Sequence, residues 1–417
     1  MSHFDHRHTN TRVLLRQGNA PLTNTDITIE HTQHAFGFGN IGFEFVDWIA
    51  GPPTGAVERS NHVPTNDMDA LATKWLDVFN MATLPFYWRH FEPAPGHPET
   101  ERLMATARWF TEKGVTVKGH PLLWHTLAPQ WLMDLDDATV ESTIRDRITR
   151  DVTQFAGVID LWDAINEVVI LPVFTAEDNA VTRLAQKKGR VEMVRLAFDT
   201  AQAANPNGRF VLNDFDLSED YEHLIEDCLA AGIRIDAIGL QTHMHQGFRG
   251  AEEIWDRMER FSRFGLPLQL TETTLVSGDL MPPHIVDLND YVVDDWPTTP
   301  EGEARQAQNL IDHYTAVFSH PATESLTYWG ITDHGAWLGA PCGLLRKDGT
   351  AKPGYDAIHD LITRQWTTPT TTQHTSTDGG VDITGFAGTY RITTPHGTTD
   401  VTLPAGTHDP VTVTVGE

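Results

Sequence analysis

The chain has 417 residues, of which 40% are hydrophobic, enough for one large folded domain and a smaller one, and this composition argues against overall disorder. Lys and Arg number 30 against 57 Asp and Glu, and the net charge of −27 excludes nucleic acid and an anionic membrane as expected partners. No basic segment followed by an apolar run opens the sequence, and no stretch approaches about 18 apolar residues. We therefore expect a cytoplasmic protein with no membrane span, while a secreted mature form stays open.

The first segment with strand character covers residues 12–31, where apolar residues alternate around a polar Gly-Asn turn. This pattern predicts a β-hairpin. We assign residues 1–30 to an N-terminal β extension that precedes the main domain.

Eight apolar segments of β type then recur at a regular spacing, with helical patterns between them. The strands are expected at 34–39, 79–84, 116–125, 159–167, 209–215, 235–243, 266–272 and 325–333. Helices are clearest at 99–114, 250–265 and 355–366, the first two ending at glycine. This alternation predicts an α/β fold, a (β/α)8 barrel over residues 31–366. A doubly wound open sheet is the rival, weakened because no G-x-G-x-x-G motif follows an early strand.

The C-terminal part of the sequence differs in composition. Residues 367–380 are rich in Thr, Ser and Gly and are interpreted as a linker. Residues 381–417 alternate in the manner of short strands and predict a small β module. Packing against the barrel is its expected role, and carbohydrate binding is the alternative. Two cysteines, Cys228 and Cys342, lack metal-type spacing, and a single bridge between them stays open.

In a (β/α)8 barrel the active site lies at the carboxyl ends of the strands, so its polar residues can be named in advance. They are His120, Trp124, His125, Asn166, Glu167, Asn213, Asp214, Gln241, His243, Glu272, Trp329, Asp333 and Trp337. Glu167 and Glu272 follow strands four and seven, whose ends face each other across the mouth. A glutamate alone at a strand end is more often a solvated charge or an ion-pair partner.

A facing pair of glutamates is what glycoside hydrolysis requires, one to protonate the leaving oxygen and one to attack the sugar or activate water. The neighbouring indoles, amides and imidazoles suit a neutral sugar. The His-Met-His run at 243–245 resembles a metal pair, but no further ligand set accompanies it. We therefore expect no metal and no cofactor.

Several motifs resemble glycoside hydrolase family 10, the retaining endo-β-1,4-xylanases, in the right order along nearly the whole chain. They are G-H-P-L-L-W-H (119–125), W-D-A-I-N-E (162–167), I-G-L-Q-T-H (238–243), L-T-E (270–272), W-G-I-T-D-H-G-A-W (329–337) and K-P-G-Y (352–355). Three more segments resemble the plant-type branch and its bacterial relatives: 299–307, 340–349 and 385–390.

The resemblance implies a role for each matched residue. Glu167 would be the acid/base and Asn166 would bond the sugar 2-hydroxyl. Glu272 would be the nucleophile, held by His243 and Gln241. The residues expected to surround the attacked sugar are His120, Trp124, Trp329 and Trp337, with His125, Asn213 and Asp333 nearby. Retention further implies carboxyl groups about 5–5.5 Å apart.

The second strand departs from the family pattern. Family members continue from F-N and T into a Glu-Asn pair and a Lys before a Trp, and these groups bind sugars on the non-reducing side. Here F-N-M-A-T-L-P-F-Y-W (79–88) places Phe86 and Tyr87 before Trp88 and keeps no Glu, Asn or Lys after the threonine. Apolar side chains do not hold hydroxyls in that way.

Two further positions differ: Thr274 replaces the frequent Asp after the nucleophile, and Leu338 replaces an Arg after Trp337. We therefore expect a retaining glycosidase with an altered preference, acting on xylan-derived or related oligosaccharides or polysaccharides, or on a glycoside whose apolar part meets Phe86 and Tyr87. A non-catalytic carbohydrate-binding barrel, a glycosidase acting on a non-xylan glycoside and a metal-dependent barrel hydrolase are the alternatives. The sequence indicates no oligomeric state.

Overall fold

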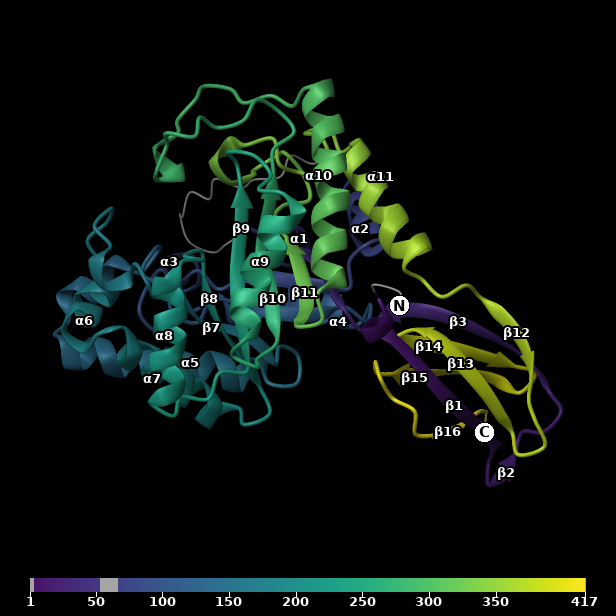
Figure 1. Ribbon diagram of the computed structural model, residues 1–417. Coiled ribbons are helices and arrows are strands. Elements are labelled where there is room, and N and C mark those ends of the chain that lie inside the picture. The colour runs from purple at the N-terminus through teal and green to yellow at the C-terminus, as the bar shows by residue number, and fades with distance from the viewer. Residues whose placement is uncertain (1–3, 53–66, 417) are drawn as a thin grey trace.

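A computed structural model describes residues 4–52 and 67–416. The molecule has two parts, a barrel surrounded by helices and a smaller β-sandwich beside it (Figure 1). Both ends of the described residues lie in the sandwich, and the barrel is formed by the segment between them.

Eight parallel strands close the barrel in the order β10–β11–β4–β5–β6–β7–β8–β9, which confirms the expected (β/α)8 fold. Each strand lies within a few residues of its predicted position. They are β4 (Gly37–Ile41), β5 (Met81–Pro85), β6 (Thr116–His120), β7 (Leu161–Asn166), β8 (Arg209–Asp214), β9 (Ala237–Met244), β10 (Leu268–Leu275) and β11 (Thr323–Tyr328). Their interiors are almost entirely buried, as expected for parallel strands covered by helices.

Helices surround the strands and begin at side chains suited to the purpose: Asp136, Asn179, Ser218 and Thr299 each accept a backbone N–H of the first turn. The α-helices are α1 (Phe43–Ala50), α2 (Met68–Leu76), α3 (Trp88–Phe91), α4 (Thr100–Thr111), α5 (Asp137–Phe155), α6 (Ala180–Lys188), α7 (Arg190–Ala204), α8 (Glu219–Ala230), α9 (Ala251–Ser262), α10 (Pro300–Ser319) and α11 (Pro353–Asp360). The helices predicted near 99–114, 250–265 and 355–366 correspond to α4, α9 and α11 with the π-helical turn η6 (Leu361–Gln365).

The predicted N-terminal hairpin is wrong in its main pairing. Strand β1 (His8–Gln17) turns back only into the two-residue β2 (Ala20–Pro21), and β3 (Asp26–His34) enters a different sheet. In one sheet β1 lies between β13 (Gly380–Phe386) and β16 (Val411–Thr414). In the other, the order is β12–β3–β14–β15. Local alternation identified the strands, but their partners lie more than 300 residues away.

The N-terminal extension and the C-terminal module are therefore one β-sandwich, not two separate units. The remaining strands are β12 (Thr371–His374), β14 (Gly388–Thr394) and β15 (Gly397–Leu403). Strand β12 falls inside the expected linker, 367–380, so that segment is partly sheet. The two sheets bury one apolar core, to which Val13, Ile29, Ile383, Ile392 and Leu403 contribute.

The sandwich packs on the end of the barrel where the strands begin, and we name this region the foot. Arg7 donates hydrogen bonds to the carbonyl oxygens of Phe318, His320 and Thr323 at 2.7–2.9 Å. Around it, the rings of Phe318 and Trp366 stack at 4.5 Å. From the C-terminal strands, the ring of Phe386 in β13 lies 5.9 Å from that of Phe318, so this part of the sandwich also contacts the barrel.

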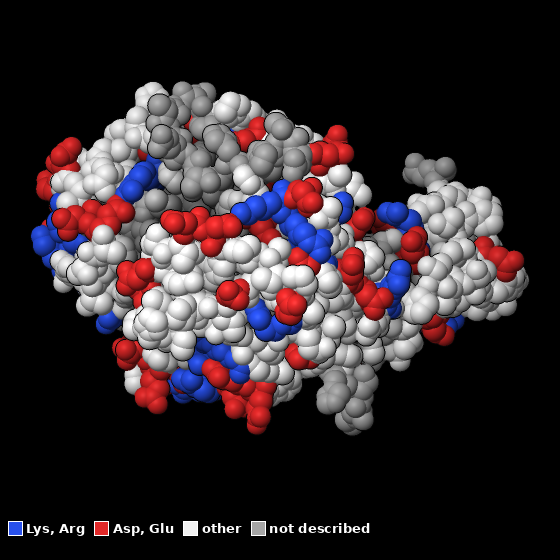
Figure 2. All heavy atoms as spheres, turned by 90° about the horizontal axis from the view of Figure 1, so that it is seen from above, with Lys and Arg blue, Asp and Glu red and all other residues white. Residues whose placement is uncertain are grey.

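The surface carries acidic and basic side chains side by side over the barrel, while the visible face of the sandwich has few of either (Figure 2). Within residues 4–52 and 67–416 no helix is long and apolar enough to span a bilayer. Cys228 and Cys342 are both buried free thiols, so the bridge left open by the sequence is not formed.

Candidate active site

Both glutamates singled out by the sequence stand at the barrel mouth, one to three residues after an irregularity in their strand. In β7, Ala164 is an extra residue in the pairing with β8, and in β10, Thr271 is an extra residue in the pairing with β9. Such bulges redirect the side chains that follow. Glu167 in addition has a φ of +58°, a left-handed conformation that costs a non-glycine residue roughly 1–3 kcal/mol. The backbone is strained where the side chain must be aimed.

Glu167 is enclosed by hydrogen-bond donors and by a second carboxylate. Its Oε2 accepts from Trp124 Nε1 at 2.8 Å, and its Oε1 accepts from Asn166 Nδ2 at 3.1 Å and Gln241 Nε2 at 3.3 Å. Burial, with the nearby charge of Glu272 as the second cause, raises the pKa of Glu167 to about 8. The side chain is therefore a protonated acid at neutral pH.

Glu272 is 5% exposed and is held from two sides. Asn213 Nδ2 donates to its Oε1 at 2.9 Å, and His243 Nε2 lies 3.1 Å from its Oε2. On the other side of the imidazole, His243 Nδ1 is 3.2 Å from the hydroxyl of Thr274. A neutral hydroxyl thus orients His243 at the position where the sequence departs from the family.

Side-chain amides join the two glutamates into one network. Asn166 Oδ1 accepts from Asn213 Nδ2 at 2.7 Å and from Gln241 Nε2 at 3.1 Å. Since Asn166 also donates to Glu167 and Asn213 also donates to Glu272, an unbroken chain of hydrogen bonds runs between the carboxyl groups. Such a network fixes both side chains before any ligand arrives.

A second buried chain lies beneath the mouth and was not foreseen. Lys118 Nζ pairs with Asp163 Oδ1 at 2.7 Å, and Asp163 Oδ2 lies 2.7 Å from His120 Nδ1. His120 Nε2 points toward Glu272, 3.9 Å from Oε1. Burial acts to raise the pKa of Asp163, but Lys118 and His120 outweigh it and lower the pKa below the usual value. Asp163 therefore stays ionised and orients His120.

Aromatic rings form a wall along the side of the mouth that β4, β5 and β6 supply. Tyr87 contacts His120 at 5.7 Å, Trp124 at 5.6 Å and Phe43 at 5.8 Å between ring centroids. Phe43 in turn contacts Trp329 at 5.7 Å. The wall replaces the polar groups that the resemblance led us to expect, and Tyr87 contributes its hydroxyl to it.

The remaining predicted residues separate into those that reach the mouth and those that do not. The ring of Trp337 lies 4.8 Å from that of His243 in a tilted arrangement, and His125 Nε2 lies 3.7 Å from Glu167 Oε2. Burial lowers the pKa of His125 to about 3, so this imidazole is neutral. Asp333 instead forms a buried ion pair with Lys352 at 2.6 Å, and its expected contact with a ligand is wrong.

Phe86 and Trp88 are also corrected. Phe86 has no exposed surface and packs on Phe91, Phe155 and Trp162 in the barrel core. Trp88 is 3% exposed and donates from Nε1 to Glu92 at 3.0 Å. Successive residues leave the end of β5 in different directions, so of this aromatic run only Tyr87 reaches the mouth.

Sequence reasoning missed Lys118, Asp163 and Phe43. The first two carried a usable signal, because each is a charged residue inside a buried strand. Phe43 carried none, since it follows β4 in an unremarkable apolar run. Among the described residues no cluster of His, Cys, Asp and Glu is placed to hold a metal ion.

The closed eight-stranded barrel with two coupled glutamates at its mouth places the chain among the (β/α)8 barrels that carry a carboxylate pair. The chain belongs to glycosyl hydrolase family 10, whose model matches residues 59–361.

Similar proteins are known from several organisms. Anti-sigma-I factor RsgI6 of Acetivibrio thermocellus is 25% identical over 389 residues, covering 90% of this chain and 43% of that protein. Endo-1,4-beta-xylanase B of Neocallimastix patriciarum is 26% identical over 272 residues, covering 60% and 28%. The chain thus spans less than half the length of either relative.

Among solved structures, xylanase 10B from Thermotoga petrophila RKU-1 in complex with xylobiose aligns with a TM-score of 0.62 at 19% identity, over 79% of this chain and 95% of that one. GH10 from Paenibacillus barcinonensis aligns with a TM-score of 0.63 at 22% identity, over 79% and 96%. At these identities the likeness supports the fold.

Proposed function

We propose that the chain is a retaining glycoside hydrolase that cleaves β-glycosidic bonds in xylan-derived or related plant oligosaccharides or glycosides. The observation that carries the proposal is the pair of unequal carboxyl groups: Glu167 with its pKa raised to about 8, beside Glu272 held by donors. Two carboxyl groups whose environments differ in this way can divide the roles of acid and nucleophile.

The first step forms a covalent glycosyl-enzyme. A Glu272 oxygen attacks the anomeric carbon while Glu167 gives its proton to the departing glycosidic oxygen, so that the C–O bond to the leaving group breaks as the ester bond forms. His243 and Asn213 orient the attacking carboxylate, and Trp124 orients the acid.

The second step returns the enzyme to its starting state. Esterification removes the charge of Glu272, which was one cause of the raised pKa of Glu167, so the pKa of Glu167 falls and the carboxylate left by the first step stays ionised and available as the base. It takes a proton from water, the hydroxide attacks the anomeric carbon on the opposite face, and Glu272 leaves as a carboxylate. The product keeps the β configuration.

The aromatic wall supports an altered substrate preference. Phe43 and Tyr87 offer ring faces and a single hydroxyl where hydroxyl-binding amides and charges were expected. A site of that kind discriminates weakly among hydroxyl patterns but favours apolar surface. We infer that the wall accepts a decorated sugar or an apolar substituent.

A carbohydrate-sensing barrel without catalysis is the second candidate. It is favoured by the RsgI6 match, which extends over 90% of this chain and carries the name of an anti-sigma factor. Binding alone does not require two coupled carboxyl groups, so the hydrolase remains the first choice.

The test is hydrolysis of a panel by the native protein and by Glu272→Gln. The panel holds xylan, arabinoxylan, mixed-linkage glucan, arabinogalactan and aryl β-glycosides of xylose, glucose, galactose and arabinose. We expect one class to be cleaved with retention, seen by proton NMR of the first product, and the rate to fall at least about a thousandfold in the variant. Since Glu167 must be protonated, activity should decline as the pH rises through about 8. Binding without cleavage would favour the sensing barrel.

A further inference from the structure

The backbone N–H and C=O of Val169, two residues after Glu167, are both held by side chains. Its N–H donates to Asp214 Oδ2 at 3.0 Å, and its carbonyl oxygen accepts from Arg190 Nε at 2.8 Å. Val168, which lies between Glu167 and Val169, is fully buried. The N–H of Glu167 donates to the carbonyl of Asn213 at 2.8 Å. The turn that carries the acid is thus tied to β8 and to the start of α7.

Asp214 ends β8 and has no exposed surface. Its second oxygen, Oδ1, accepts the N–H of Asp216 at 2.9 Å. Within residues 4–52 and 67–416 no cation forms an ion pair with it, and burial raises its pKa to about 7. Burying a carboxyl group without a cation costs desolvation free energy. The two backbone N–H groups that Asp214 accepts are the contacts that offset this cost.

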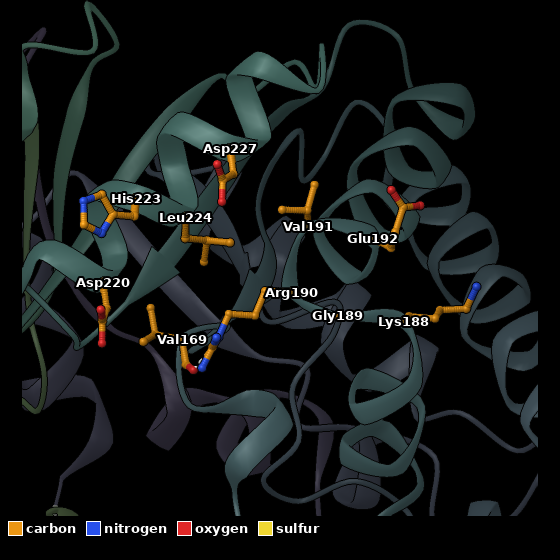
Figure 3. Close-up of a pocket in the computed structure, with 10 residues that line it drawn as sticks. All are labelled: Val169, Lys188, Gly189, Arg190, Val191, Glu192, Asp220, His223, Leu224 and Asp227. Carbon is orange, nitrogen blue, oxygen red and sulfur yellow. Dashed lines mark hydrogen bonds between the residues drawn. The ribbon is translucent and has the colours of Figure 1, made fainter.

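Arg190 is the first residue of α7 and reaches Val169 from the outside of the barrel (Figure 3). It lines a cavity of about 390 Å³ between α7 and α8, which Lys188 and Asp227 also border. The guanidinium is held there with its Nε on the Val169 carbonyl. The side chain that anchors the turn from outside is therefore separate from the mouth.

Glu167 adopts its left-handed conformation at the start of this turn, and a strained residue keeps such a backbone only when its surroundings determine it. We propose that Asp214 and Arg190 are positioning residues, which clamp the backbone N–H and C=O of Val169 and thereby keep the Glu167 carboxyl aimed at the leaving oxygen. Neither needs to touch the substrate. The expected effect on kcat/KM rests on the proposed function. The expected effect on the backbone around Val169 does not.

The kinetic test uses aryl β-xylobiosides whose leaving phenols range from dinitrophenol to unsubstituted phenol. A good leaving group departs without a proton, whereas phenol requires the acid. In Asp214→Ala we expect kcat/KM to fall about 10–100-fold for the phenyl substrate and less than about twofold for the dinitrophenyl substrate. Arg190→Ala should follow the same order with a smaller loss, because the inner hydrogen bond survives.

Two matched controls separate positioning from a general loss of structure. Arg195→Ala removes the same charge from the same helix without touching Val169, and Asp227→Ala removes a carboxyl group that borders the same cavity. Both should retain the native dependence on the leaving group. An equal loss for all leaving groups in Asp214→Ala, or no loss, would overturn the proposal.

Amide hydrogen exchange by NMR gives a readout independent of activity. The Val169 N–H should exchange at least about tenfold faster in Asp214→Ala than in the native protein, while amides within β4 keep their rates. Unchanged exchange at Val169 would refute the clamp. If the native protein cleaves no xylobioside, the proposed function fails on that substrate, and the exchange rates still decide whether the clamp exists.

Discussion

The mouth and the foot of the barrel are built on different principles. At the mouth, buried polar groups satisfy one another: Glu167 and Glu272 are joined through amides, and Lys118 lies under them with Asp163. At the foot, Phe318 and Trp366 pack against each other, and Arg7 donates hydrogen bonds to backbone carbonyl oxygens rather than to a carboxylate. Burying charged groups lowers the free energy of unfolding but fixes the orientation of the side chains. Burying aromatic rings raises the free energy of unfolding. The difference predicts that changes at the mouth alter activity and changes at the foot alter stability.

The largest effect is expected from a change at the mouth that lowers both stability and activity. Lys118→Met leaves Asp163 buried without its lysine, and we expect the free energy of unfolding to fall by about 3–5 kcal/mol together with a loss of activity. Urea unfolding and kcat/KM on the identified substrate measure both. The double variant Lys118→Met, Asp163→Leu removes both charges and should be more stable than the single one. Equal stability of the two variants would contradict the interpretation.

Next in size is the foot. Arg7→Met strands carbonyl oxygens at the end of α10 and should lower the free energy of unfolding by about 2–3 kcal/mol with kcat/KM unchanged. Arg16→Met, in the strand β1 that follows Arg7, removes one hydrogen bond to the carbonyl of Asn19 and should cost less than about 0.5 kcal/mol. A fall in activity in Arg7→Met would show that the two ends are coupled.

A pH titration sharpens the comparison further. Burial lowers the pKa of His31, near the foot, to about 4, below the usual 6.5. The unfolded chain therefore binds the proton more readily, and stability should fall by about 1–2 kcal/mol per such histidine as the pH drops from 6.5 to 5. His31→Gln should flatten this slope in thermal unfolding at pH 7 and pH 5. The raised pKa of Glu167 has the opposite sign, since stability is lost as the pH rises from about 4.5 to 8.

The smallest effect concerns the aromatic wall. Tyr87→Phe removes one hydroxyl and keeps the ring contacts, so kcat/KM should fall less than about tenfold and the melting temperature should hold. The size of the fall on xylo-oligosaccharides compared with aryl glycosides measures whether the hydroxyl contacts a sugar. A hundredfold loss would mean that this hydroxyl takes part in the chemistry.

Most of the mouth could be predicted from the sequence because a barrel converts strand order into position. Glu167 directly follows β7 and Glu272 lies in the second half of β10, and the fold brings the carboxyl ends of these strands together. The amides of Asn166 and Asn213 follow from the same rule. Phe86 and Trp88 were misplaced because strand alternation no longer determines direction once β5 has ended, and Asp333 was misplaced because its partner, Lys352, lies in a later loop.

The foot could not be predicted in the same way. Local alternation correctly indicated strands near both ends of the chain, but the pairing of β1 with β13 and of β3 with β14 depends on contacts across the whole sequence. No spacing rule relates those segments. Nor do the described residues of the sandwich expose a Trp, Tyr or Phe ring on which a sugar could stack.

Because β1 pairs with β13 and β16, its sheet can form only after those two strands have been synthesised. The first strand leaves the ribosome long before its partners exist, and at about 5–20 residues per second the wait is roughly 20–75 s. During that time its alternating face and unpaired edges stay available to other chains. The barrel can form before the sandwich is complete. Strands β13 and β16 then pair with β1 and complete its sheet.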